Sequence, residues 1–178
     1  MQRRQALQKI AALGAATVSG AAIAAPAVIT QPSIQWRLAS SFPKSLDTIY
    51  GAAEMLSKRV AQLTDGKFQI RVFASGDLVP GLQVLDAVSN GTVECGHTAG
   101  YYYVGKSKAF AFDTCLPFGL TARQQNAWYS QAGGQQLLAE LFKQYNIVNF
   151  AGGNTGAQMG GWFRKPINSL KDLQGLKM

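Results

Sequence analysis

The chain has 178 residues, a length that suits one domain, or one domain and part of another. Hydrophobic residues make up 47% of it, enough to build a core. The formal net charge of +8 is typical of nucleic-acid-binding proteins, but three basic residues lie within the first ten positions and the others never cluster beyond a pair. Because phosphate binding needs a concentrated basic surface, this spread argues against a nucleic-acid partner.

Residues 1–27 have the pattern of an export signal peptide. A basic head precedes a run of small apolar residues at 10–25, and alanines with the spacing that a signal peptidase accepts follow. The pair Arg3 and Arg4 before a mildly hydrophobic run favours the twin-arginine route. A transmembrane anchor is disfavoured because the run is short and interrupted by glycine and proline. We expect cleavage between residues 24 and 32 and a periplasmic mature protein.

Residues 34–98 predict alternating strands and helices. Strands are expected at 34–39, 67–74 and 92–98, and amphipathic helices at 46–63 and 82–90. This βαβαβ order favours a parallel sheet covered by helices on both faces. In such α/β sheets, ligands bind beyond the carboxyl ends of the strands.

Two loops are expected to converge at that edge of the sheet. One comprises residues 40–45, and the other begins at Gly100 and contains the tyrosines 101–103. One or two of these rings could line a pocket while the remaining ring packs inside, although packing alone also explains such a run. His97 lies in the third predicted strand and is interpreted as a core histidine rather than a catalytic base.

After an apolar, turn-rich stretch at 106–120, the pattern predicts two helices, a strand, an extended segment and a helical turn. Thr121 with Gln124, and Ser169 with Asp172, have the spacing of helix caps. The predicted elements are, in order, 121–131, 134–145, 146–150, 159–163 and 169–172. We expect a first α/β lobe at 34–120 and the beginning of a second, incomplete α/β lobe at 121–178.

The two cysteines, Cys95 and Cys115, leave their pairing open. An exported protein can form a disulfide, but both residues lie in apolar runs where a cysteine often serves as a small buried hydrophobe. Together with His97 they lack the spacing of zinc ligands.

The segment 152–164, GGNTGAQMGGWFR, is the strongest candidate for a binding site. Its five glycines let the backbone approach a ligand closely. Asn154 and Gln158 can offer a carbonyl oxygen to a metal or N–H groups to a carboxylate, and Arg164 is a two-pronged donor. The segment suits a small anion; the alternative is a glycine-rich turn between two core strands.

Four blocks of the chain carry a family resemblance, and they are IQWRLASSFPKSLDTIYGAAE, VECGHTAGYYYVGK, PFGLTARQQNAW and GGNTGAQMGGWFRK. The sequence from residue 34 to residue 178 resembles the extracytoplasmic solute-binding subunit of TRAP transporters. Within that family it is most similar to the subgroup that binds 2-oxo acids and related monocarboxylates.

The resemblance implies an α/β fold of the periplasmic binding protein type II-like class, with two α/β lobes that close on the ligand. The first lobe is expected to be complete or nearly so, and the second truncated. The family's substrate-clamping arginine lies in the pattern GLKxR, whose last position would follow Met178. We therefore expect an N-terminal fragment, and Arg164 then fits a lobe-surface or hinge residue better than the clamp.

The resemblance also implies site residues. Gln158 matches a glutamine whose side-chain oxygen binds a sodium or calcium ion that bridges the protein and the substrate carboxylate, as suits a hard cation. Asn154 matches a polar neighbour of the substrate, and Tyr101 or Tyr102 an aromatic wall or hydroxyl donor. Phe42, in the first loop, is expected to flank the pocket.

The implied function is capture of a small organic acid, a monocarboxylate such as a 2-oxo acid, and its delivery to TRAP membrane permease subunits. The resemblance implies no organic cofactor and is compatible with a homodimer. Two alternatives remain: an exported enzyme acting on a carboxylic acid, and an exported sensor input module. Against the enzyme, the sequence shows no Ser/His/Asp set, no paired carboxylates and no nucleophile elbow.

Overall fold

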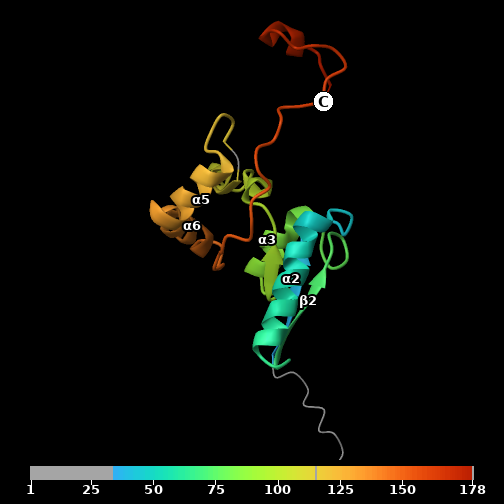
Figure 1. The fold of residues 1–178 in the computed structure, drawn as a ribbon, viewed down its shortest axis with the longest axis vertical. Helices are drawn as coiled ribbons and strands as arrows, with labels where there is room; N and C mark the ends of the chain where they lie inside the picture. The colour runs from blue at the N-terminus through green and yellow to red at the C-terminus, as the bar shows by residue number, and fades with distance from the viewer. Residues whose placement is uncertain (1–33, 115, 178) are drawn as a thin grey trace, which may run out of the picture. The chain divides into compact units, whose positions relative to one another are not determined.

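The computed structural model describes residues 34–114 and 116–177. The predicted export signal lies outside the described residues. Within them, the strands form one parallel sheet with the order β2-β1-β3 (Figure 1). The strands are β1 (Ile34–Ser40), β2 (Phe68–Phe73) and β3 (Cys95–His97). The predicted α/β class and parallel sheet are confirmed, and β3 is shorter than the predicted strand at 92–98.

Helices cover both faces of the sheet, as the sequence predicts. The helix α2 (Asp47–Leu63) follows β1, and η1 (Gly81–Gln83) leads into α3 (Val84–Ser89). Successive strand residues point to opposite faces. Leu38 accordingly clusters with Ala53 of α2, whereas Ala39 clusters with Val84 of α3.

A glycine in β3 allows α3 to pack closely on the sheet. A Cβ atom at Gly96 would lie 2.6 Å from Cγ1 of Val84 and 3.0 Å from Cγ2 of Val88. Val84 is 1% exposed, so its methyl groups have little room to move away. The spacing between β3 and α3 therefore depends on the missing side chain of Gly96.

The carboxylate of Glu94 ties the start of β3 to β1. Glu94 Oε1 accepts from Nη2 of Arg37 at 2.7 Å, and Oε2 accepts from Nε at 3.0 Å and from the Arg37 backbone N–H at 2.7 Å. The β1–β3 register begins only at Leu38 and Cys95, so the carboxylate takes the place of a strand partner for this N–H. The hydrogen bonds from Arg37 lower the pKa of Glu94 to about 2.

Beyond the two clusters on the faces of the sheet, a third hydrophobic cluster is built mainly from the elements that follow β3. Phe110 is fully buried, and Leu85, Tyr103, Leu138 and Phe142 pack around it. The elements are η2 (Gly100–Tyr103), η3 (Lys108–Phe110), α4 (Ala111–Thr114), α5 (Ala122–Gln131) and α6 (Gly134–Lys143). The cluster joins α6 to α3 and η2, so its members come from both sides of residue 120, where the sequence predicts the boundary between the lobes. The boundary itself stays a prediction.

Both predicted helix caps are confirmed. Thr121 and Gln124 form a capping box at the start of α5, in which the Gln124 N–H donates to Thr121 Oγ1 at 3.4 Å and the Thr121 N–H donates to Gln124 Oε1 at 2.9 Å. Ser169 and Asp172 form the same motif at η4 (Leu170–Leu173). These signals are read within four residues, so the sequence alone is sufficient to find them.

The predicted strand at 146–150 is wrong. Asn146 has a φ angle of +58° and follows the end of α6, and Val148 and Phe150 are 81% and 78% exposed. No strand occurs among residues 116–177, so the backbone groups of 146–150 have no neighbouring strand to pair with. The segment 159–163 likewise pairs with no strand.

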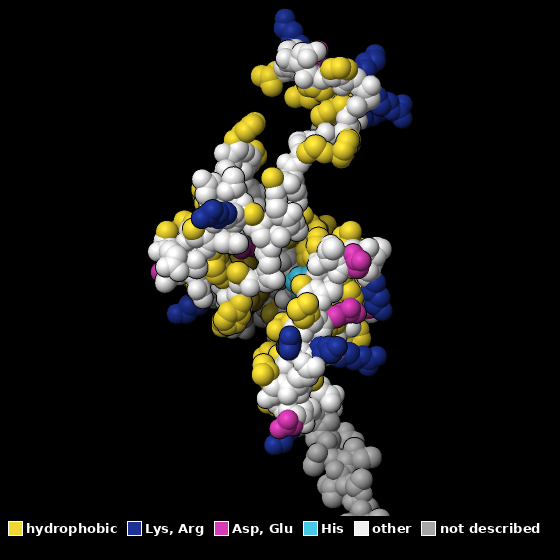
Figure 2. All heavy atoms as spheres, in the orientation of Figure 1, with side chains coloured by type: hydrophobic (Ala, Val, Ile, Leu, Met, Phe, Trp, Pro, Cys, Tyr) yellow, Lys and Arg dark blue, Asp and Glu magenta, His cyan; other side chains and the backbone are white. Residues whose placement is uncertain are grey.

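Cys95 is a free thiol, so it forms no disulfide within the described part of the chain; Cys115 lies outside that part. Burial, and to a smaller extent the nearby Glu94 carboxylate, raises the pKa of Cys95 to about 11. Figure 2 shows lysine and arginine side chains in small separate groups over the visible face rather than in one basic patch. None of the described helices is both long and apolar enough to cross a membrane.

We expect Gly96→Ala to lower the free energy of unfolding by about 1–3 kcal/mol, because the new methyl group overlaps Val84. Gly51→Ala is the matched control, since a Cβ atom at this α2 position meets nothing within 4 Å. Alanine there should raise the free energy of unfolding by roughly 0.5–1 kcal/mol. Urea denaturation followed by circular dichroism measures both; equal effects would contradict the close approach of α3.

We expect Arg37→Met to raise the pKa of Glu94 from about 2 toward 4.5, measured by carboxyl ¹³C NMR. A lowered carboxyl pKa stabilises the folded state above the unfolded pKa, and this contribution is lost as pH falls through the folded pKa. The wild type should therefore lose stability between about pH 4.5 and about pH 2, and the variant less so. Arg71→Met, at the adjacent position of β2, is the control and should leave the pKa of Glu94 unchanged.

Candidate functional site

The loops that follow β1 and β3 converge, as predicted, through hydrogen bonds between their first residues. The Ser41 N–H donates to the His97 carbonyl oxygen at 2.8 Å. Ser41 Oγ lies 2.6 Å from Thr98 Oγ1, which lies 2.7 Å from the Tyr103 hydroxyl. The Leu85 N–H donates to that hydroxyl at 3.2 Å, so the network also reaches the start of α3.

Aromatic rings gather over these strand ends. The Phe42 ring is 5.1 Å from the His97 ring and 6.2 Å from the Tyr102 ring, and Tyr102 is 4.5 Å from Tyr101. Tyr103 is 2% exposed and belongs to the hydrophobic cluster, whereas Tyr101 is 36% exposed. One tyrosine of the run thus packs inside, as predicted, while Tyr102 lies beside Phe42 and Tyr101 lies beside Tyr102.

The short helix η2 that carries the tyrosines is anchored by Asp113. The Gly100 N–H donates to Asp113 Oδ2 at 3.0 Å, and the Tyr101 N–H donates to Thr114 Oγ1 at 3.0 Å. A Cβ atom at Gly100 would overlap the Asp113 carboxyl group. Burial raises the pKa of Asp113, and the Gly100 N–H partly opposes this rise.

His97 belongs to this group of residues, although the sequence favours a core histidine. Its Nδ1 lies 3.3 Å from Ser40 Oγ, and this oxygen accepts from the Phe42 N–H at 3.1 Å. Burial lowers the pKa of His97, so the neutral imidazole is favoured. The signal that could have found His97 is its place at the carboxyl end of a predicted strand, where ligands bind in such sheets.

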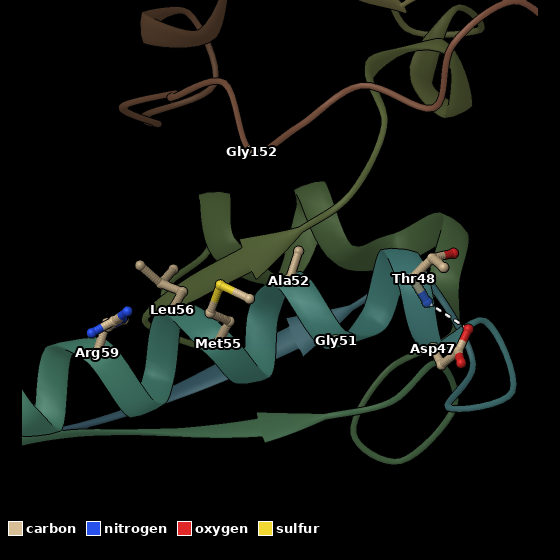
Figure 3. Close-up of a pocket in the computed structure, with 8 residues that line it drawn as sticks. All are labelled: Asp47, Thr48, Gly51, Ala52, Met55, Leu56, Arg59 and Gly152. Atoms are coloured by element: carbon tan, nitrogen blue, oxygen red, sulfur yellow. Dashed lines mark hydrogen bonds between the residues drawn. The ribbon is translucent and has the colours of Figure 1, made fainter.

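The glycine-rich segment 152–164 begins beside this cluster. A Cβ atom at Gly152 would lie 4.0 Å from Cδ2 of His97. Gly152 also lines a pocket of about 580 Å³ against α2, and Figure 3 shows Ala52, Met55 and Leu56 pointing toward the side where Gly152 lies. The first residue of the glycine-rich segment therefore lies at the sheet edge, next to the end of β3.

Asn154 and Gln158 are exposed, and their hydrogen bonds stay within the segment. Asn154 Oδ1 accepts from the Gly156 N–H at 2.7 Å, in a turn that places Gly156 at a φ of +78°. Gln158 Nε2 donates to Thr155 Oγ1 at 3.4 Å. The NH₂ group of Asn154 and the carbonyl oxygen of Gln158 thus remain available to a ligand.

The alternative interpretation, a turn between two core strands, is wrong because no strand flanks the segment within residues 116–177. The structure joins Phe42, Tyr101 and Tyr102 through ring contacts. It shows no hydrogen bond from Asn154 or Gln158 to those rings.

A cation would find only neutral oxygen donors in this segment. Among the described residues, no three His, Cys, Asp or Glu side chains are grouped so that they could hold a metal ion. The free carbonyl oxygen of Gln158 fits a hard cation such as Na⁺ or Ca²⁺ as one ligand of several.

Comparison with known proteins shows that the chain is similar to periplasmic solute-binding proteins. A monocarboxylate 2-oxoacid-binding periplasmic protein of Nostoc sp. is 58% identical over 147 residues, which are 83% of this chain and 40% of the relative. A TRAP transporter solute-binding protein of Bordetella bronchiseptica RB50 is 61% identical with a TM-score of 0.76, over 80% of this chain and 42% of that one. Its crystal structure is a dimer with calcium and picolinate in one active site and the other site apo.

A TRAP periplasmic solute-binding protein of Pseudoalteromonas atlantica T6c, solved with sodium and pyruvate, is 42% identical with a TM-score of 0.75. It is matched over 80% of this chain and 44% of its own. The chain thus spans less than half the length of these relatives. A profile of the bacterial extracellular solute-binding protein family 7 matches residues 39–178. The chain therefore belongs to the bacterial extracellular solute-binding proteins of family 7.

Proposed function

We propose that this chain forms the first part of a periplasmic TRAP-type solute-binding protein that captures a small monocarboxylate, a 2-oxo acid such as pyruvate. The observation that carries the proposal is the meeting of the glycine-rich segment, at Gly152, with the aromatic cluster of Phe42, His97 and Tyr102 at the carboxyl edge of the sheet. The relatives that bind 2-oxo acids support the choice of ligand.

The two amides of the segment fit different parts of such a ligand. Gln158 keeps its carbonyl oxygen free, which suits a Na⁺ or Ca²⁺ ion that bridges the protein and the substrate carboxylate. The side-chain oxygen of Asn154 is occupied, since it accepts from the Gly156 N–H, whereas its two N–H donors are free. These donors suit a carboxylate or keto oxygen of the ligand.

The aromatic residues fit the apolar part of the ligand. Phe42 and Tyr102 form a wall at the end of the sheet, and Tyr101 extends it toward solvent. A 2-oxo acid has a short carbon chain beside its two polar groups, so an apolar wall suits the carbon chain and amide groups suit the polar end.

The family and its relatives are binding proteins, and we infer that this chain is not an enzyme. An export signal at residues 1–27 would direct it to the periplasm, where TRAP membrane permease subunits would receive the ligand. A sensor input module would use the same site, and coupling to a signalling partner in place of a permease would distinguish it. The dimer of the Bordetella relative supports a homodimer.

We expect ligand binding to depend on the cation. The protein to test is a receptor chimera in which residues 34–178 of this chain, with all of β1, precede the C-terminal remainder of the Bordetella bronchiseptica protein. Isothermal titration with pyruvate should show binding with Ca²⁺ or Na⁺ present and weaker binding in chelated, sodium-free buffer, because the carboxylate loses its bridging ion. Equal affinity in both buffers would contradict the ion bridge.

In the same chimera, Gln158→Ala should weaken pyruvate binding by at least about tenfold, or 1.4 kcal/mol, because the cation loses an oxygen ligand. The thermal transition of the ligand-free protein should stay close to wild type, since the Gln158 side chain is exposed. Gln136→Ala is the matched control, an exposed amide on α6 that should bind like wild type. A large stability loss in Gln158→Ala with unchanged affinity would indicate a packing role instead.

A further inference from the structure

The hydroxyl group of Ser40 determines which nitrogen of His97 carries the proton. Ser40 is 1% exposed, so its hydroxyl hydrogen needs an acceptor within the protein. Ser40 Oγ accepts from the Phe42 N–H at 3.1 Å and lies 3.3 Å from His97 Nδ1. Nδ1 is the one acceptor available to this hydroxyl among residues 34–114 and 116–177.

The alternative tautomer would leave a buried group unpaired. If Nδ1 carried the proton, it would donate to Ser40 Oγ, and the Ser40 hydroxyl hydrogen would be buried without an acceptor. If Nδ1 is bare, the Ser40 hydroxyl donates to it, and both the Phe42 N–H and the Ser40 hydroxyl hydrogen are paired. Because burial also favours the neutral ring, the proton of His97 resides on Nε2.

Nε2 is the free donor of this chain of hydrogen bonds. Nε2 has no hydrogen-bond partner in the described part of the protein. The buried side-chain atoms of that part that lack a partner are Tyr129 Oη and Asn149 Oδ1. Nε2 is therefore not buried and remains accessible to solvent. The neighbouring ring atom Cδ2 lies on the Gly152 side, and the Phe42 ring packs 5.1 Å from the imidazole ring. The imidazole ring that carries this N–H therefore lies next to both the Phe42 ring and the start of the glycine-rich segment.

We propose that His97 donates a hydrogen bond from Nε2 to an oxygen of the captured 2-oxo acid, and that Ser40 is the positioning residue that holds the required tautomer. This inference rests on the proposed function and adds a neutral donor at the sheet edge, near Gly152 of the glycine-rich segment. A neutral donor suits a ligand whose carboxylate charge is already balanced by a cation, because a second positive charge would compete with that cation.

The tautomer can be read directly, because His97 is the only histidine of the 178-residue chain. In a long-range ¹H–¹⁵N spectrum, Nε2 couples to both ring C–H protons and Nδ1 to only one, so the two nitrogens are assigned without ambiguity. We expect the protonated nitrogen at neutral pH to be Nε2, and Ser40→Ala to shift the population toward Nδ1–H. A wild-type spectrum with Nδ1 protonated would overturn the inference.

Two amide substitutions separate the ring positions in the receptor chimera. The shorter side chain in His97→Asn places its amide near the Nδ1 site and lacks the outer donor. This variant should therefore weaken pyruvate binding by about tenfold to a hundredfold, as for a lost hydrogen bond to a charged acceptor. The longer side chain in His97→Gln extends its NH₂ group to the Nε2 site and should retain more of the affinity. Equal affinities for wild type and His97→Asn would overturn the donor role.

The proposed function and this inference fail in different ways. A wild-type chimera that binds no pyruvate in calcium contradicts the proposed function, while the tautomer spectrum of the chain still decides whether Ser40 acts as argued. If His97→Asn unfolds, the wild-type chimera labelled with ¹⁵N-histidine decides instead. Pyruvate should then protect the His97 Nε2–H from exchange with solvent, and an unchanged exchange rate in a chimera that does bind would overturn the inference.

Discussion

The hydrogen bonds between the ends of β1 and β3 are the interactions on which the candidate site depends. Ser41 bonds through its N–H to His97 and lies within hydrogen-bond distance of Thr98 through its hydroxyl, and Ser40 links His97 to the Phe42 backbone. Both serines are buried, so their polar atoms have to stay paired and permit few arrangements. The positions of the Phe42 and His97 rings follow from this constraint.

The network is supported from behind by α3 and the hydrophobic cluster. Tyr103 takes part in both, since its hydroxyl contacts Thr98 and its ring packs on Phe110 at a centroid distance of 5.9 Å. Gly96 allows α3 to approach the sheet closely enough for the Leu85 N–H to reach Tyr103. The outer tyrosines are thus held in place by a packed core.

Much of the first half could be predicted because its signals are local or periodic. The apolar spacing predicted α2, the alternation of strands and helices predicted a parallel sheet, and four-residue capping patterns predicted the starts of α5 and η4. The strand at 146–150 was mispredicted because an apolar run resembles a strand whether or not a neighbouring strand exists. His97 was interpreted as a core residue because sequence does not show which ring atoms reach solvent.

The sequence by itself determined the family, the α/β class and the residue types of the candidate binding segment, because motifs, periodicity and helix caps depend only on the order of residues. Only the tertiary structure decided that Gly152 meets His97, that Tyr103 is the inner tyrosine and that Ser40 pairs with His97 Nδ1. These contacts join residues up to 57 positions apart. Their geometry depends on how the sheet, helices and loops pack together, and this packing cannot be inferred from the spacing of residues along the chain.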